Sequence, residues 1–154
     1  MWRERHDGEK LREKTIEFIK RAHAGQVDKA GQPYHLHPMA VAELLPPDSD
    51  EDEYLAALLH DVLEDTEITE TDLCDLGYSE KTIGIVKLLT RPAGVTYLDS
   101  IRQIAASGNE GAIRVKLADN IHNSDPDRLA QLPPEQRSIA KRYERSIRIM
   151  RDAL

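Results

Sequence analysis

The sequence predicts an all-α protein, a single helical bundle of about seven or eight helices over residues 1–154. Three observations support this fold class. Apolar residues recur at helical spacing along most of the chain, and no segment shows the sustained alternation that is typical of a strand. Aromatic residues make up only 5% of the chain, so the core must consist mainly of leucine, isoleucine, valine and alanine. Such a composition favours helices over strands.

The first two expected helices are separated by a loop that contains glycine and proline. Residues 9–24 carry apolar side chains at helical spacing, and Gly25 is expected to end this helix. The segment 25–37 is punctuated by turn-forming residues and is expected to be a loop. Pro38 suits the first turn of a second helix, which is expected to run to about Leu45.

A third helix is expected to begin in the acidic stretch 48–52, where the helix dipole favours negative charge. Its apolar stripe continues into the polar segment 60–65, so this segment is expected to lie on the same continuous helix. The stripe consists of Leu55, Leu58, Leu59, Val62 and Leu63.

The rest of the chain is expected to form five further helices. Four of them are expected at residues 70–76, 79–90, 97–107 and 109–123. Asp125-Pro126 is expected to break the chain after the fourth. Pro133-Pro134 then opens a final amphipathic helix that is expected to run to about Arg151.

Composition excludes several classes of function. The chain is globular in balance, with 40% hydrophobic and 32% charged residues, and its formal net charge is -7. An acidic chain lacks a broad field for nucleic acid or anionic lipid, and no stretch approaches the ~20 apolar residues of a membrane span. Cys74 is the single cysteine, which rules out an internal disulfide and fits the cytoplasm. A phosphate substrate would need a local positive charge, such as a bound cation.

The segment 60–65, HDVLED, carries the strongest chemical signal. On a helix, His60 and Glu64 lie four residues apart on one stripe, and Asp61 and Asp65 lie on the next. Three carboxylates so close together repel each other unless solvent, arginine or a cation compensates their charge. The segment is therefore either a cation site or a solvated acidic surface.

Two further segments contain residues that could ligate a metal. His37 precedes Pro38 at the N-terminal edge of a helix, where it is either a ligand or a capping or surface histidine; His35 is the competing candidate. Asp119 follows an apolar and small-residue run, so its side chain is expected to be partly buried and to need a partner. It is either a ligand or a hydrogen-bonded structural aspartate. Asn123 lies four residues later and could reach the same pocket.

Two histidines and two aspartates together suit a borderline-hard divalent metal with open positions for water and substrate. An all-oxygen calcium site or a thiolate zinc site is not supported. Such a cation would polarise a phosphoryl oxygen and lower the pKa of water.

Four segments in this order resemble the HD-domain phosphohydrolases. More narrowly, they are similar to the hydrolase domain of the RelA/SpoT homologues and to the stand-alone small alarmone hydrolases. The similarity extends over roughly residues 10–150, so the whole chain is expected to be a single HD hydrolase domain, with no length left for a synthetase domain. The segments are AHAGQ (22–26), GQPYHLHP (31–38), AALLHDVLEDT (56–66) and VKLAD (115–119).

The resemblance implies an all-helical HD bundle that holds a divalent metal, typically manganese, with iron or zinc as alternatives. It assigns the metal ligands to His37, His60, Asp61 and Asp119.

The resemblance also implies roles for residues around the metal. Glu64 and Asp65 match a Glu-Asp pair that orients water and transfers protons. Lys29 matches a basic residue near the nucleotide phosphates, Asn123 a nucleotide-contacting asparagine, and Tyr143 a tyrosine of the last helix. The implied reaction is the attack of water on phosphorus, which removes the 3′-pyrophosphate from guanosine tetra- or pentaphosphate or from an adenosine analogue.

The sequence departs from the family pattern around the base. Asp28 stands where the family often has arginine, Asn120 where it usually has arginine or lysine, and Pro126 among residues that shape the base and ribose pocket. Two alternatives follow: an HD phosphohydrolase for another nucleotide or phosphate ester, and a non-catalytic nucleotide- or metal-binding module.

The apolar positions of the last helix permit a homo-oligomer, although packing into the domain's own core is the preferred explanation. They are Ile139, Tyr143, Ile147 and Met150.

Overall fold

The chain is all helical, as its sequence predicts. The computed structural model describes the backbone of residues 2–154 and the side chains of residues 8–154. In this part of the chain, the only β-type pairing is an isolated bridge between Val27 and Pro33. The helices are α1 (Trp2–Ala22), α2 (Leu36–Glu43), α3 (Glu51–Leu59), α4 (Val62–Asp65), α5 (Glu70–Asp75), α6 (Glu80–Leu89), α7 (Tyr97–Ala106), α8 (Glu110–Asn123), α9 (Pro126–Ala130), the 3-10 helix η1 (Pro134–Gln136) and α10 (Ile139–Ala153).

The described residues thus form ten α-helices, more than the seven or eight expected. The additional helices are the short α4 and α9, which are too brief to show a periodic pattern in the sequence. None of the helices in the described chain is both long and apolar enough to cross a membrane.

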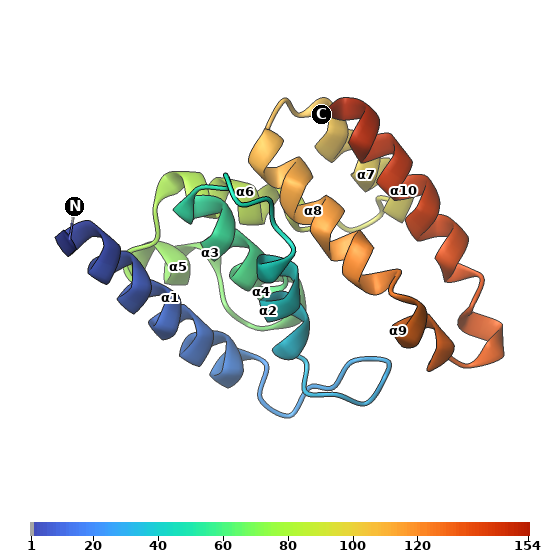
Figure 1. Ribbon diagram of the computed structural model, residues 1–154, viewed down its shortest axis with the longest axis horizontal. Helices are drawn as coiled ribbons and strands as arrows, with labels where there is room; N and C mark the ends of the chain where they lie inside the picture. Colours follow the sequence, from blue (N-terminus) through green and yellow to red (C-terminus); the bar gives the residue numbers. More distant parts are fainter. Residues whose placement is uncertain (1) are drawn as a thin grey trace.

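Helix α3 lies at the centre of the first half of the chain. It packs against α1, α2, α6 and α8, and Figure 1 shows it enclosed between α1 and α8. Its last turn is completely buried because residues 56–59 are small or apolar on every side of the helix. Helix α8 lies beside α10, and also contacts α2, α6 and α7, so α3 and α8 join the two halves.

A close contact and an ion pair hold α8 against α3. Gly111 on α8 has no side chain, and a Cβ atom there would lie 3.1 Å from both Glu53 Cγ and Ile85 Cδ1. One turn later, Arg114 forms a bidentate ion pair with Glu53, with Nε 3.0 Å from Oε2. Because Glu53 is 3% exposed, the ion pair with Arg114 offsets the cost of burying its carboxylate.

The expected continuous helix through residues 60–65 is wrong, because α3 ends at Leu59 and α4 begins at Val62. The imidazole Nδ1 of His60 lies 2.6 Å from the Ala57 carbonyl oxygen. In an unbroken helix that oxygen would accept the amide of Asp61, so the side chain competes with the backbone hydrogen bond. His60 and Asp61 therefore occupy a turn between two helices instead of adjacent stripes of one helix.

Several helix ends differ from the expected positions. Helix α1 starts at Trp2 rather than at residue 9, and it ends at Ala22 before a turn in which Gly25 has a φ of 81°. Helix α10 begins at Ile139, because η1 occupies the chain after Pro134. The middle helices α5, α6, α7 and α8 begin and end within about three residues of the expected bounds.

Asp125 and Pro126 start a helix rather than only interrupting the chain. The Asp125 side chain accepts the amides of Asp127 and Arg128, so it caps α9, and Pro126 occupies the first position of that helix. A proline there lacks only an amide that the helix would leave unpaired.

Candidate metal centre and its cavity

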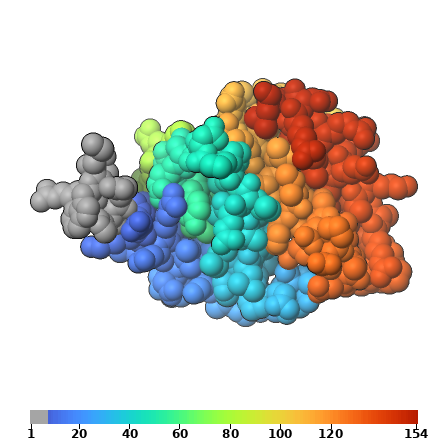
Figure 2. All heavy atoms as spheres, in the orientation of Figure 1, coloured from blue at the N-terminus to red at the C-terminus, as the bar shows by residue number. Residues whose placement is uncertain are grey.

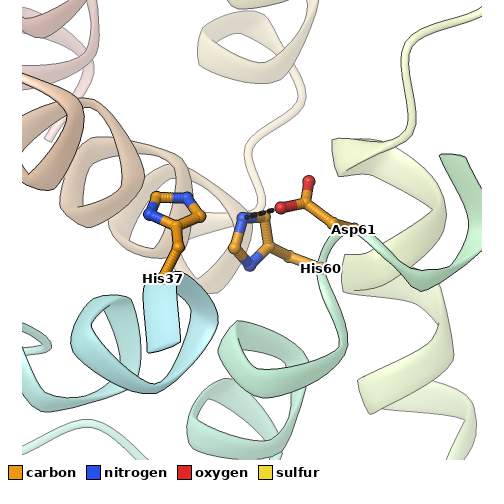
Figure 3. Close-up of side chains that lie close together, drawn as sticks. All are labelled: His37, His60 and Asp61. Atoms are coloured by element: carbon orange, nitrogen blue, oxygen red, sulfur yellow. Dashed lines mark ion pairs between the residues drawn. The ribbon is translucent and has the colours of Figure 1, made fainter. Parts of the chain in front are cut away.

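Four side chains from three parts of the chain meet between α2, α8 and the α3–α4 turn. Ligand atoms of His37, His60 and Asp61 all lie within 4.8 Å of one another. Figure 3 shows His37 reaching from α2 toward the ring of His60, with Asp61 on the other side of that ring. Asp119 on α8 closes the group, since its Oδ1 lies 2.7 Å from His37 Nε2 and 3.5 Å from His60 Nε2.

Each of these residues is held by the element that carries it. His37 lies in the first turn of α2, where Pro38 continues the helix without needing an amide partner. His60 and Asp61 occupy the turn after α3, where His60 Nε2 lies 3.0 Å from Asp61 Oδ2. Asp119 is 5% exposed on the inner face of α8, in agreement with the expected burial. Its Oδ1 accepts a hydrogen bond of 3.2 Å from Asn123 one turn later.

Both histidine rings are oriented through the nitrogen that faces away from the cluster. His60 Nδ1 donates to the Ala57 carbonyl oxygen at 2.6 Å. His37 Nδ1 lies 2.7 Å from Nδ1 of His122, which stacks on it with ring centroids 4.9 Å apart. Burial and the neighbouring His37 lower the pKa of His122 to about 4, so His122 is neutral near pH 7 and can accept this bond. Such bonds fix the tautomer and direction of metal-ligating imidazoles.

The surroundings of His60 Nε2 fit a cation. The ring is 2% exposed, and this nitrogen has no hydrogen-bond partner of good geometry, yet it faces the carboxylates of Asp61 and Asp119. Burial lowers the pKa of His60, but the two carboxylates outweigh burial and raise it well above the usual range. A positive charge is therefore favoured beside this nitrogen, and a divalent cation with two imidazole and two carboxylate ligands would supply it.

The carboxylates of the cluster are ionised in spite of their burial. Burial raises the pKa of Asp61, but His60 counteracts it and the pKa falls to about 2. Burial likewise raises the pKa of Asp119, but Lys116, with Nζ 3.0 Å from Asp119 Oδ2, and the two histidines bring it well below the usual range. Tyr34 donates a hydrogen bond of 2.6 Å to Asp61 Oδ2. Burial and the Asp61 charge raise the Tyr34 pKa, so the phenol keeps its proton and remains a donor.

A cavity of about 300 Å³ opens beside the cluster. All of the residues predicted for the site line it except His60, which is buried behind Asp61. The lining residues are Val27, Asp28, Lys29, Ala30, Tyr34, His37, Asp61, Glu64, Asp65, Tyr97, Lys116, Asp119, Asn123, Arg128, Leu132 and Tyr143.

Glu64 and Asp65 lie on α4 at the cavity wall. Glu64 is exposed and its Oε1 accepts the amide of Arg91 at 3.1 Å. The backbone carbonyl of Asp65 accepts Gln26 Nε2 at 2.9 Å, which ties α4 to the loop after α1. Burial and the neighbouring Asp61 charge raise the pKa of the Asp65 carboxyl. A carboxyl with a raised pKa beside an ionised one is a suitable arrangement for proton transfer.

The residues that depart from the family pattern all have structural partners. Asn120 is fully buried, and its Oδ1 accepts a hydrogen bond of 3.0 Å from the Tyr97 hydroxyl. Its Nδ2 donates to the Lys116 carbonyl oxygen. Asp28 pairs with Arg128, and Pro126 begins α9.

Four residues that complete the site were not predicted from the sequence. They are Tyr34, Lys116, His122 and Arg128. Tyr34 and Lys116 stand in segments quoted for the resemblance, and His122 lies three residues after Asp119, so their positions on the same helix or loop were a usable signal. Arg128 is 100 residues from Asp28, and no local pattern relates the two.

Known proteins resemble this chain over most of its length. A family model described as "HD domain" matches residues 15–145. A guanosine-3′,5′-bis(diphosphate) 3′-pyrophosphohydrolase of Haemophilus influenzae is 35% identical in an alignment of 130 positions that covers 78% of this chain and 19% of that protein. A GTP pyrophosphokinase of Myxococcus xanthus is 35% identical over 71% of this chain and 16% of its own length. The chain thus spans less than a fifth of either relative.

A solved structure has the same fold. It belongs to a metazoan orthologue of SpoT that is described as hydrolysing ppGpp and playing a role in starvation responses. The TM-score is 0.77 at 24% sequence identity, and the superposition covers 92% of this chain and 86% of the other. The arrangement of helices is therefore shared along nearly the whole of both chains.

Proposed function

Because the chain belongs to the HD-domain family, we propose that it is a divalent-metal-dependent phosphohydrolase that removes the 3′-pyrophosphate of guanosine tetra- or pentaphosphate or an adenosine analogue. The observation that carries the proposal is the convergence of two imidazoles and two carboxylates beside a cavity with a second carboxylate pair. The names of the relatives support the choice of reaction. The whole chain would serve as one hydrolase domain.

His37, His60, Asp61 and Asp119 would hold the metal, which we propose to be manganese. When bound, the cation supplies Lewis-acid polarisation of a phosphoryl oxygen. Mixed nitrogen and oxygen ligands suit manganese, iron and zinc. A single exposed cysteine, Cys74, is compatible with the cytoplasmic location that we propose.

Glu64 and Asp65 would orient the attacking water and move its proton. They line the cavity next to Asp61, and burial and the Asp61 charge raise the pKa of the Asp65 carboxyl, which suits a group that takes up a proton. The proton of the attacking water would pass to this pair and from it to the nucleoside 3′-oxygen as the bond from phosphorus to that oxygen breaks, which leaves pyrophosphate and a 3′-hydroxyl.

Substrate contacts would come from three sides of the same cavity. Lys29 is an exposed cation on the loop after α1, where it can meet phosphate oxygens. Asn123 presents its amide next to Asp119, and Tyr143 offers an aromatic face from α10. A cavity of about 300 Å³ with an open mouth is the size of a small nucleotide-binding cleft.

Turnover tests this proposal. The purified chain with manganese should release pyrophosphate from guanosine 3′,5′-bis(diphosphate). Glu64→Gln should lower kcat by about 10²–10⁴-fold, the usual contribution of a positioned acid or base. Glu67→Gln is the matched control, because Glu67 is exposed and outside the cavity lining. Absence of pyrophosphate release while a titration shows manganese bound would refute the reaction.

The second candidate is an HD phosphohydrolase for another nucleotide or phosphate ester. The observation that favours it is Asp28, whose carboxylate is engaged by Arg128 at the position where the family often has an arginine. A panel of nucleotides under defined manganese separates the two candidates. Faster cleavage of a 5′-nucleotide than of any 3′-pyrophosphate would favour the second.

A further inference from the structure

We propose that the Asp28–Arg128 ion pair is a positioning clasp, which fastens the α1–α2 loop (residues 23–35) to α9 and so places Lys29 at the cavity. The role of Lys29 as a substrate contact rests on the proposed function; the clasp itself does not. Neither Asp28 nor Arg128 would read the base of the nucleotide.

The Asp28 carboxylate is already occupied by protein donors. Its Oδ1 accepts the backbone amides of Ala30 and Gln32, each at 2.9 Å, and its Oδ2 accepts Arg128 Nη1 at 3.0 Å. The side chain is only 5% exposed. Three protein donors and this burial leave it little capacity for a hydrogen bond to a base, although it lines the cavity. Asp28 therefore shapes the loop on either side of Lys29.

Arg128 forms the other half of the clasp. It lies on α9, whose start is fixed by the Asp125 cap, and its side chain is 23% exposed. Figure 1 shows the α1–α2 loop extending toward α9, and Figure 2 shows the atoms of these two segments side by side. One ion pair thus joins parts of the chain that are 100 residues apart.

The other side-chain hydrogen bonds from the loop to the body of the protein lie toward its two ends. Gln26 donates to the Asp65 carbonyl oxygen, and Tyr34 donates to Asp61 Oδ2. The Val27–Pro33 bridge closes the loop on itself without linking it to α9. Asp28 and Arg128 neutralise each other, so Lys29 is left as the charged group of the loop that can attract phosphate. Loss of the clasp would leave the charge on Lys29 but release its position.

Amide hydrogen exchange tests the clasp without reference to activity. Arg128→Gln should increase exchange across residues 26–34 by about tenfold, since the loop would open more often, while α3 stays protected. Arg102→Gln is the matched control, because Arg102 forms an exposed ion pair with Asp99 on α7, away from the loop. Unchanged exchange in the loop of Arg128→Gln would overturn the proposal, whatever reaction the protein catalyses.

Kinetics on the full chain separate positioning from direct contact. Asp28→Asn, Arg128→Gln and the double variant should each raise KM by about tenfold and leave kcat within about twofold. The double variant should be no worse than either single variant, because both remove the same interaction. Additive effects would show that Arg128 binds substrate directly, and an altered preference between guanosine and adenosine substrates in Asp28→Asn would show base reading. Either result would overturn the clasp.

Discussion

The two histidine rings of the candidate metal centre are each held by a hydrogen bond at Nδ1, but with different partners. His60 Nδ1 donates to the main-chain carbonyl of Ala57 in the last turn of α3, so this hydrogen bond depends on local backbone geometry. His37 instead depends on His122, a side chain from α8 that lies 85 residues away in the sequence. The hydrogen bond that orients His37 can therefore be removed by substituting His122, which leaves all four proposed metal ligands in place.

We expect His122→Phe to weaken manganese binding by about 10–100-fold, the usual cost of losing a hydrogen bond that orients a ligand. Phenylalanine keeps a ring against His37 but cannot accept its Nδ1 proton. Isothermal titration of manganese into the purified variant measures the effect.

The matched control for this variant is His35→Phe. His35 lies at the start of α2 with no capping bond and outside the cavity lining. Its substitution should leave the manganese affinity unchanged. Equal losses in the two variants would contradict the proposed role of His122.

Helices α3 and α8 must keep a fixed position relative to each other for the proposed ligands to stay together. Helix α3 leads to His60 and Asp61, and α8 carries Asp119. Gly111 permits their close approach, and the Glu53–Arg114 ion pair sets their register. Glu53 is 4% exposed in its side chain and Arg114 25%, so this pair is much less screened by solvent than the surface pairs.

We expect Arg114→Ala to lower the free energy of unfolding by about 3 kcal/mol, because it leaves the buried Glu53 charge without its partner. Urea unfolding followed by circular dichroism measures this loss. Arg102→Ala, which breaks an exposed pair within α7, should cost less than about 0.5 kcal/mol. A loss of similar size in both variants would contradict the importance of the α3–α8 pair.

The candidate metal centre is made of side chains from distant parts of the chain. Its proposed ligands come from α2, from the α3–α4 turn and from α8, so they join elements that span residues 36–123. A ligand that requires this arrangement binds the folded chain and not the unfolded one, and it therefore stabilises the fold by mass action.

We expect saturating manganese to raise the free energy of unfolding by about 2.7 kcal/mol at a hundred times the dissociation constant. Thermal unfolding with manganese and with a chelator measures the difference. Asp61→Asn should abolish most of the gain, since it removes one ligand while keeping a similar side-chain volume. An equal gain in that variant would mean that the ion binds elsewhere.

Local patterns in the chain were sufficient for the helical class and for most helices. The apolar spacing in residues 79–90 and 109–123 depends only on neighbours within a few turns, and α6 and α8 follow it closely. The residues around Pro38 and Asp119 could also be recognised as candidates, because their side-chain chemistry and spacing are readable without a fold.

Side-chain hydrogen bonds and contacts between distant residues decided the rest. The helix breaks at His60 because its side chain competes with the Asp61 amide for the carbonyl oxygen of Ala57, and a periodic apolar stripe cannot reveal such a competition. The stacking of His122 on His37 and the pairing of Arg128 with Asp28 join residues 85 and 100 positions apart. Helix periodicity has a range of a few residues, whereas burial and charge pairing act through space, so these features emerge only when the chain is packed.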